Sequence, residues 1–252
     1  MPRYFIRLAY DGTAYCGWQI QPNGITVQQT INESLATILK QPVMVHGAGR
    51  TDAGVHAKEF FAHFDFDETL DSVNLDKLRY NLNGLLPPNI SVYSIFQVQP
   101  DAHARFSAVS RKYEYIISRR KEPFLINRAW FFYQKLNIEL MQKSTDILLE
   151  YHDFSCFTSS NTQTTSYTCN IMQASWEEHD NILIFSITAN RFLHNMVRAI
   201  VGTLVETGRG KLSPEMMRKI IESGDRRLAG ITAPAKGLYL VSVTYPSDIF
   251  LP

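Results

Sequence analysis

The 252-residue sequence has few cysteines and no long apolar run. Its three cysteines, Cys16, Cys156 and Cys169, are widely spaced and form no Cys-x-x-Cys pair, which argues against a disulfide framework and a structural zinc site. No apolar stretch approaches the ~18 residues of a membrane-spanning helix. The N-terminus also lacks the apolar core of a secretory signal. We therefore expect a cytoplasmic protein that does not enter a membrane.

Charge of one sign is not in excess either. The formal net charge is +1, with 19% charged and 45% hydrophobic residues, a composition typical of folded proteins that excludes wholesale disorder. Residues 1–100 carry 7 basic and 9 acidic side chains, whereas residues 101–252 carry 18 and 15. A local basic stripe within 101–128 suits a polyanion met on one face, although such runs are more often solvated edges.

Hydrophobic periodicity predicts the element order β-α-β-β-α-β twice. In the first half we expect strands at 3–10, 43–46, 59–66 and 90–98, with helices at 27–39 and 75–85. In the second half we expect strands at 111–117, 171–178, 182–189 and 238–245, and helices at 138–148, at 196–208 and from Pro214 onward.

Two such halves are ferredoxin-like units, which predicts an α+β fold with halves at 1–103 and 104–252. Their sheets can merge into one mainly antiparallel mixed sheet with a central cleft. Aromatic sheet faces of this kind commonly receive RNA. The segment 153–168 is rich in Ser, Thr and Asn and predicts a mobile surface loop.

The densest candidate site is the string Gly-Ala-Gly-Arg-Thr-Asp-Ala-Gly-Val-His-Ala at 47–57. Small residues allow close approach of a ligand and leave Arg50 and Asp52 uncovered. It lacks the Gly-Lys-Ser/Thr of a phosphate-binding loop and the last glycine of a dinucleotide fingerprint. Spacing alone leaves two interpretations open, a tight turn or a functional site.

The same string resembles the active-site signature of the tRNA pseudouridine synthase A (TruA) family. The similarity continues through Tyr10-Asp11-Gly12-Thr13, Ala104-Arg105-Phe106-Ser107-Ala108, Arg111-Lys112-Tyr113-Glu114-Tyr115, Met196-Val197-Arg198 and Gly237-Leu238-Tyr239-Leu240. One departure is Cys169, which stands where the family frequently has Arg. It bears on one RNA-backbone contact and not on the chemistry.

The resemblance implies the pseudouridine synthase fold, in which two ferredoxin-like halves form one mixed sheet. It further implies isomerisation of uridine to pseudouridine at positions 38, 39 and 40 of the tRNA anticodon stem-loop, by a homodimer. The half 1–103 would carry the catalytic Asp loop, and the half 104–252 the base-stacking Tyr and the Arg. The chemistry requires no metal, organic cofactor or other small-molecule cofactor.

Roles carry over residue by residue. Asp52 would act as nucleophile or base, and Arg198 would keep it ionised. Tyr113 would stack on the target base, Leu238 would form the apolar wall under the uracil, and Arg50 would enter the gap left by the flipped nucleotide. Whether Asp52 attacks C1′, attacks C6 or removes the 2′ proton stays open. The candidate phosphate contacts are Arg105, Lys112, Arg119, Arg120, Lys121, Arg191, Arg209 and Lys211.

Plainer interpretations exist for several of these residues. A helical Arg such as Arg198 commonly extends its charge to solvent, and Tyr113 and Leu238 resemble ordinary packing residues. For the whole chain, the leading alternative is a non-catalytic RNA-binding protein of the same fold. A nucleotide-phosphate enzyme is a third reading, which the absence of a phosphate-binding Lys from the glycine loop disfavours.

Overall fold

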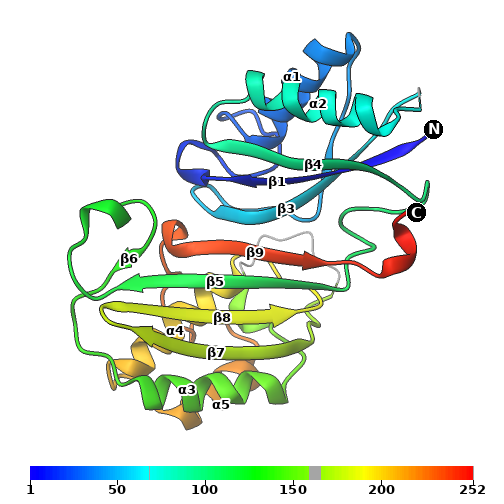
Figure 1. Ribbon diagram of the computed structural model, residues 1–252. Coiled ribbons are helices and arrows are strands. Elements are labelled where there is room, and N and C mark those ends of the chain that lie inside the picture. The colour runs from blue at the N-terminus through cyan, green and yellow to red at the C-terminus, as the bar shows by residue number, and fades with distance from the viewer. Residues whose placement is uncertain (68, 159–165, 252) are drawn as a thin grey trace. The chain divides into compact units, whose positions relative to one another are not determined.

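The computed structural model describes residues 1–67, 69–158 and 166–251 (Figure 1). By its contacts the chain divides into two compact units. Unit 1 comprises Met1–Val109 and Tyr239–Pro252, and unit 2 comprises Ser110–Leu238. The C-terminal segment therefore belongs to the first unit, whereas the predicted halves divide between residues 103 and 104. The roles assigned to those halves stay predictions.

Unit 1 contains a mainly antiparallel sheet with the strand order β4-β1-β3-β9. β1 pairs antiparallel with β3 and β4, the short β2 pairs antiparallel with β3, and β9 runs parallel to β3. Helices α1 and α2 cover one face of β1, β3 and β4 (Figure 1). The elements are β1 Arg3–Tyr10, α1 Val27–Leu39, β2 His46–Gly47, β3 His56–Asp65, α2 Ser72–Leu85, β4 Ile90–Val98, β9 Leu238–Thr244 and the 3-10 helices Gly12–Ala14 and Ser247–Ile249.

The sequence explains why α1 forms and which face it buries. Thr26 caps the helix, because its side-chain oxygen accepts a hydrogen bond from the Gln29 backbone N–H at 3.3 Å. Val27, Ile31 and Leu35 then recur on one face and are fully buried. Burial of each such side chain favours folding by about 1.5–3 kcal/mol before entropy is counted. The core of unit 1 therefore lies along the helix-covered face of its sheet.

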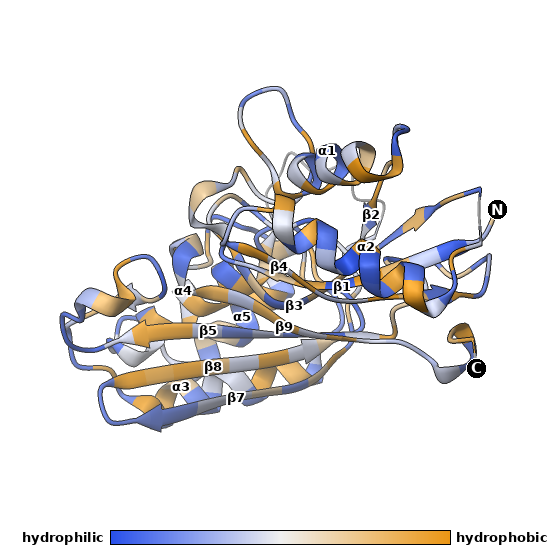
Figure 2. Ribbon diagram, turned by 45° about the horizontal axis from the view of Figure 1, so that its top comes forward, coloured by the Kyte–Doolittle hydropathy of each residue, from blue (hydrophilic) through white to orange (hydrophobic). Residues whose placement is uncertain are grey.

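Unit 2 contains an antiparallel sheet with the order β5-β8-β7, and the short β6 runs parallel to β5. β8 is coloured mainly hydrophobic in Figure 2, and it alternates buried and half-buried residues. Helix α3 contacts β7, α4 and α5. The elements are β5 Ser110–Ser118, β6 Trp130–Phe131, α3 Ile138–Ile147, β7 Ile171–His179, β8 Ile182–Ala189, α4 Met196–Gly208, α5 Pro214–Ser223 and the 3-10 helices Pro123–Leu125, Leu148–Glu150, Ser155–Phe157 and Ala235–Gly237.

The predicted α+β class with a mainly antiparallel mixed sheet is confirmed, and the central cleft stays a prediction. Two strands near the glycine loop differ from their predicted bounds. The strand expected at 43–46 is only His46–Gly47, and the strand expected from residue 59 begins at His56. β3 starts early because His56 and Ala57 pair with Tyr239 and Leu240 of β9, a partner almost two hundred residues away that periodicity does not reveal.

The prediction of a surface loop at 153–168 is wrong for its first part. Phe154, Cys156 and Phe157 are fully buried, and the last two lie in the 3-10 helix Ser155–Phe157. The two aromatic rings lie in the core of unit 2. The sequence did not predict their burial because the neighbouring residues are polar. The predicted mobility of residues 159–165 lies outside the described residues.

Candidate active site

The glycine loop that carries Asp52 is anchored to the sheet of unit 1. His46 and Gly47 of β2 pair with His63 and Ala62 of β3, and the Ala48 backbone N–H donates to the Phe61 carbonyl at 2.7 Å. The other end of the loop closes where the Val55 N–H donates to the Asp52 carbonyl at 3.2 Å. Asp52 therefore lies on a short connection that is fixed at both ends.

The segment after β1 supports this loop from the side. The Trp18 N–H donates to the Thr51 carbonyl and the Gly54 N–H donates to the Tyr15 carbonyl, both at 3.3 Å. The Tyr10 hydroxyl and the Thr51 hydroxyl are 2.9 Å apart. These bonds leave the backbone around Asp52 little freedom to move.

Two glycines make the support possible. A Cβ at Gly12 would overlap the Val55 carbonyl, and a Cβ at Gly17 would overlap the Thr51 carbonyl. Gly17 also has a φ of +84°, which side chains disfavour. Sequence reasoning found this segment only as a similarity to the family. Nothing in its spacing indicated that it packs on the Asp52 loop.

His56 ends the loop and is almost completely buried. Its Nδ1 accepts a hydrogen bond from the Gly12 backbone N–H at 3.1 Å and lies 3.2 Å from an Asp11 carboxylate oxygen. The ring stacks on Tyr239 with centroids 4.6 Å apart. His56 thus joins the end of the loop to β9.

Arg50 and Asp52 differ in exposure. The Arg50 side chain is exposed and Asp52 is half-buried. The loop therefore presents the Arg50 side chain to solvent two residues from a less exposed carboxylate.

In unit 2, Arg198 lies in the first turn of α4 and is half-buried. Its Nε donates to the Ala233 carbonyl at 2.7 Å, and one terminal nitrogen donates to the Asn195 side chain at 2.9 Å. The predicted alternative, an Arg that simply extends to solvent, does not describe this side chain. The guanidinium is held in one orientation by groups on both sides of it.

Tyr113 and Tyr115 lie on the same face of β5. The Tyr113 ring is half-buried and meets Phe192 edge-to-face, with centroids 5.1 Å apart. Tyr115 is fully buried and its hydroxyl donates to the Pro234 carbonyl at 2.7 Å. Burial raises the pKa of Tyr115 above its usual value, and the nearby Arg198 partly opposes this. Tyr115 is therefore a neutral hydrogen-bond donor, whereas Tyr113 is less deeply buried.

Leu238 opens β9 and is 6% exposed. It follows the 3-10 helix Ala235–Gly237, where a Cβ at Gly237 would lie 2.7 Å from the Tyr115 ring. The glycine therefore lets the chain pass close to β5 immediately before Leu238. The burial is that of a packing residue and is equally what an apolar wall requires.

Several predicted phosphate contacts are already in ion pairs. Lys112 lies 3.5 Å from Glu114, and Arg119 lies 2.8 Å from Glu178. Arg105 is exposed, with its guanidinium 5.3 Å from the Phe106 ring centroid, and Arg191 is half-buried near Cys169. The remaining pairs are Arg120–Glu122, Arg209–Glu206 and Lys211–Glu206, and Lys121 is exposed.

Three histidines from separate segments meet in unit 1, which sequence reasoning did not foresee. The rings of His46 and His63 lie 5.1 Å apart, and those of His63 and His103 lie 4.4 Å apart. Burial, with the nearby His103, lowers the pKa of His63 to about 3. Among the described residues, no group of three or more His, Cys, Asp or Glu side chains is arranged to hold a metal ion.

The described helices include none with the length and apolar character needed to cross a membrane. The α+β fold with its anchored aspartate loop is that of the pseudouridine synthases. A family model described as tRNA pseudouridine synthase matches residues 150–246. Relatives named tRNA pseudouridine synthase A cover nearly the whole chain, so the chain belongs to the tRNA pseudouridine synthase A family.

Three of these bacterial relatives illustrate the similarity. The protein of Bacteroides thetaiotaomicron is 52% identical over 99% of this chain and 93% of its own length. The protein of Porphyromonas gingivalis is 49% identical over the full length of both chains. The protein of Thermoanaerobacter pseudethanolicus is 40% identical over 97% of this chain and all of its own length.

Proposed function

We propose that this chain isomerises uridine to pseudouridine in tRNA. The reaction breaks the N1–C1′ bond, rotates the uracil and forms a C5–C1′ bond, while the C5 proton leaves and N1 gains one. The observation that carries the proposal is the anchored Asp52 loop in a chain of this family. A carboxylate on an anchored backbone, near an exposed Arg in the sequence, suits a nucleotide that has been flipped from its helix.

The remaining roles belong to the same proposal. Arg198 keeps Asp52 ionised, Tyr113 stacks on the target base, Leu238 forms the wall under the uracil and Arg50 fills the vacated position. The fixed orientation of Arg198 and the half-buried position of Tyr113 support these assignments. Asp52 acts by attack on C1′, by attack on C6 or by removal of the 2′ proton.

We further propose the anticodon stem-loop, at positions 38, 39 and 40, as the target. The enzyme works as a homodimer in the cytoplasm. Three free cysteines, two of them buried, accord with a reducing compartment. The phosphate contacts are Arg105, Lys112, Arg119 and Arg191, supplemented by Arg120, Lys121, Arg209 and Lys211.

The test uses a tRNA transcript with tritium at C5 of its uridines. Wild-type protein in EDTA is expected to release tritium to water, and Asp52→Asn is expected to lower the rate by at least ~1,000-fold because the reactive carboxylate is lost. The matched control is Asp76→Asn on α2, whose side chain is 77% exposed and pairs with Arg79 at 3.3 Å. It is expected to react at the wild-type rate.

Two results would contradict the proposal. Tight binding of the transcript without tritium release by the wild type would favour the non-catalytic RNA-binding protein. Equal rates for wild type and Asp52→Asn would remove Asp52 from the chemistry. Release that is confined to transcripts with uridine at 38, 39 or 40 is expected, and release from other stems would reject the proposed target.

A further inference from the structure

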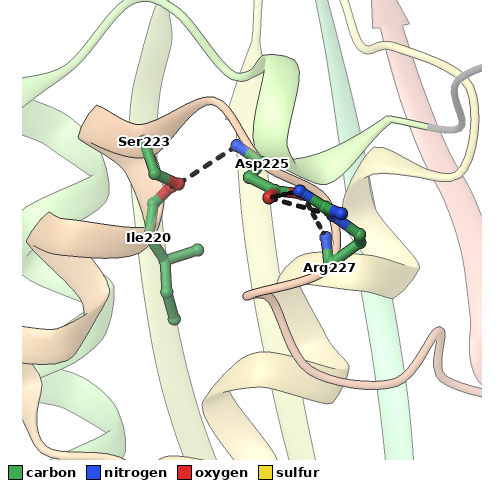
Figure 3. Close-up of polar contacts among 4 residues, drawn as sticks. All are labelled: Ile220, Ser223, Asp225 and Arg227. Atoms are coloured by element: carbon green, nitrogen blue, oxygen red, sulfur yellow. Dashed lines mark hydrogen bonds and ion pairs between the residues drawn. The ribbon is translucent and has the colours of Figure 1, made fainter.

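The loop that follows α5 has a built-in turn. Gly224 ends the helix with a φ of +62°. Ser223 then accepts the Asp225 N–H at 3.1 Å, and Asp225 accepts the Arg227 N–H at 2.9 Å and pairs with the Arg227 guanidinium at 2.7 Å (Figure 3). These local bonds send the chain back toward α4 and place Arg226 between two tied residues.

Arg226 folds the rest of the loop around its own side chain. Its guanidinium donates to the Gly230 carbonyl at 2.9 Å, to the Thr232 hydroxyl at 2.8 Å and to the Ala229 carbonyl at 3.5 Å. The side chain is half-buried, and these three bonds go to neutral acceptors within six residues. A cation that binds its own backbone in this way determines the shape of a loop.

The folded loop lies directly on α4. The Gly230 N–H donates to the Thr203 hydroxyl at 2.8 Å. A Cβ at Gly202 would overlap the Ile231 carbonyl, and a Cβ at Gly230 would lie 2.7 Å from the Thr203 Cα. The loop and the helix therefore meet backbone to backbone, a contact that only glycines at 202 and 230 allow.

The end of this loop holds Arg198. The Ala233 N–H donates to the Arg198 carbonyl at 3.0 Å, and the Ala233 carbonyl accepts from the Arg198 Nε at 2.7 Å. Ala233 follows directly on the residues that Arg226 binds. The carbonyl that fixes the guanidinium of Arg198 therefore lies at the end of the segment that Arg226 folds, and the backbone of α4 holds the same residue through the Ala233 N–H.

We propose that Arg226 is a positioning residue for Arg198. It makes no contact with substrate in this role; it folds residues 229–233 so that the Ala233 carbonyl fixes the direction of the Arg198 guanidinium. The inference rests on the proposed function for its catalytic consequence. Its structural claim, that Arg226 controls the Arg198 Nε–H hydrogen bond, is measurable without any activity.

The first readout is the arginine Nε–Hε NMR spectrum of the full chain, with the Arg198 signal assigned by its loss in Arg198→Lys. In Arg226→Gln the exchange of the Arg198 Hε proton with water is expected to accelerate by at least about tenfold. Thr232→Val, which removes one acceptor of Arg226, is the milder variant and is expected to accelerate the exchange of the Arg198 Hε proton by a smaller factor. Arg218→Gln on α5 is the matched control, because its guanidinium pairs with Glu150 and is not part of this loop. It is expected to leave the Arg198 signal unchanged.

The second readout is single-turnover tritium release together with the tRNA dissociation constant. Arg226→Gln is expected to slow release by at least about tenfold in the wild type but by less than about twofold in Arg198→Lys, with tRNA affinity unchanged. Two results would overturn the inference. One is an equal loss of tritium-release rate in the wild-type and Arg198→Lys backgrounds, and the other is an Arg198 Hε exchange rate that Arg226→Gln leaves unchanged. Wild-type protein without tritium release would instead reject the proposed function, while the NMR result would still decide the structural claim.

Discussion

Single residues decide whether the Asp52 loop can be supported at all. Gly12 and Gly17 lie so close to Val55 and Thr51 that a methyl group has no room at either position. In both cases the obstacle is backbone, which cannot move aside as a flexible side chain can. The catalytic proposal therefore depends on glycines outside the glycine loop itself.

We expect Gly12→Ala to lower the free energy of unfolding by about 1–3 kcal/mol, because the Val55 carbonyl must shift. Tritium release should fall with it, since Val55 closes the Asp52 loop. The control is Gly84→Ala near the end of α2, where a Cβ meets open space. That variant should raise the free energy of unfolding by about 0.5–1 kcal/mol. Urea unfolding of both proteins checks the pair, and an unaltered Gly12→Ala variant would refute the close-approach argument.

The histidine cluster makes a second expectation at this scale. The pKa of His63 is about 3 in the folded protein, against 6.5 for the exposed side chain. Between pH 3 and pH 6.5 His63 is protonated in the unfolded chain but not in the folded protein. The stability that His63 contributes is therefore complete above pH 6.5 and is lost as the pH falls toward 3. The pKa of His103 is lowered too, chiefly by burial.

Urea unfolding between pH 7.5 and pH 4 tests this. We expect the midpoint for the wild type to fall with pH, and His63→Gln to fall less steeply, because glutamine keeps an acceptor for the Ala104 N–H but has no proton to gain. His179→Gln is the control, since that side chain is 65% exposed. Equal slopes for wild type and His63→Gln would show that other groups carry the acid sensitivity.

At the scale of elements, hydrophobic periodicity predicted the helices and strands whose signals lie within their own stretch of sequence. α1 has its cap, its apolar face and its Pro42 stop within one short stretch, so its bounds were predictable. The early start of β3 was not, because His56 and Ala57 owe their strand conformation to β9. The burial of Phe154 and Phe157 was missed because polar neighbours dominate that stretch.

The candidate site divides in the same way. Asp52, Arg50, Arg198, Tyr113 and Leu238 were identified by resemblance, since their chemistry is written in local motifs. The groups that hold them were not. Gly12 and Gly17 are distant in sequence from Thr51 and Val55, and the Ala233 carbonyl that fixes Arg198 is a backbone atom with no sequence signature. Resemblance proposes the reactive groups, whereas support from a distant backbone appears only in the structure.

At the scale of the whole molecule, one chain offers little net charge to a polyanion. The formal net charge is +1, and five of the proposed phosphate contacts, Lys112, Arg119, Arg120, Arg209 and Lys211, already pair with glutamates. Because each released counterion strengthens binding to a nucleic acid, few available cations mean weak attraction. A second copy of the chain would double the number of cations offered to one tRNA.

We therefore expect the protein to sediment at twice the 28.8 kDa of a single chain, at the concentration at which it modifies tRNA.

The salt dependence of tRNA binding tests single cations. Lys121→Ala, which removes an exposed lysine, should flatten the dependence of log affinity on log salt by about one unit, since one phosphate contact is lost. Arg120→Ala should flatten it less, because Glu122 already offsets that charge at 3.4 Å. Equal slopes for Lys121→Ala and Arg120→Ala would mean that the ion pair with Glu122 does not weaken the contact of Arg120 with RNA.

The dimer prediction has its own contrary outcome. A protein that sediments as a monomer yet reacts with tRNA at the full rate would show that one chain suffices. The dimer proposal would then be wrong, while the proposed chemistry would stand.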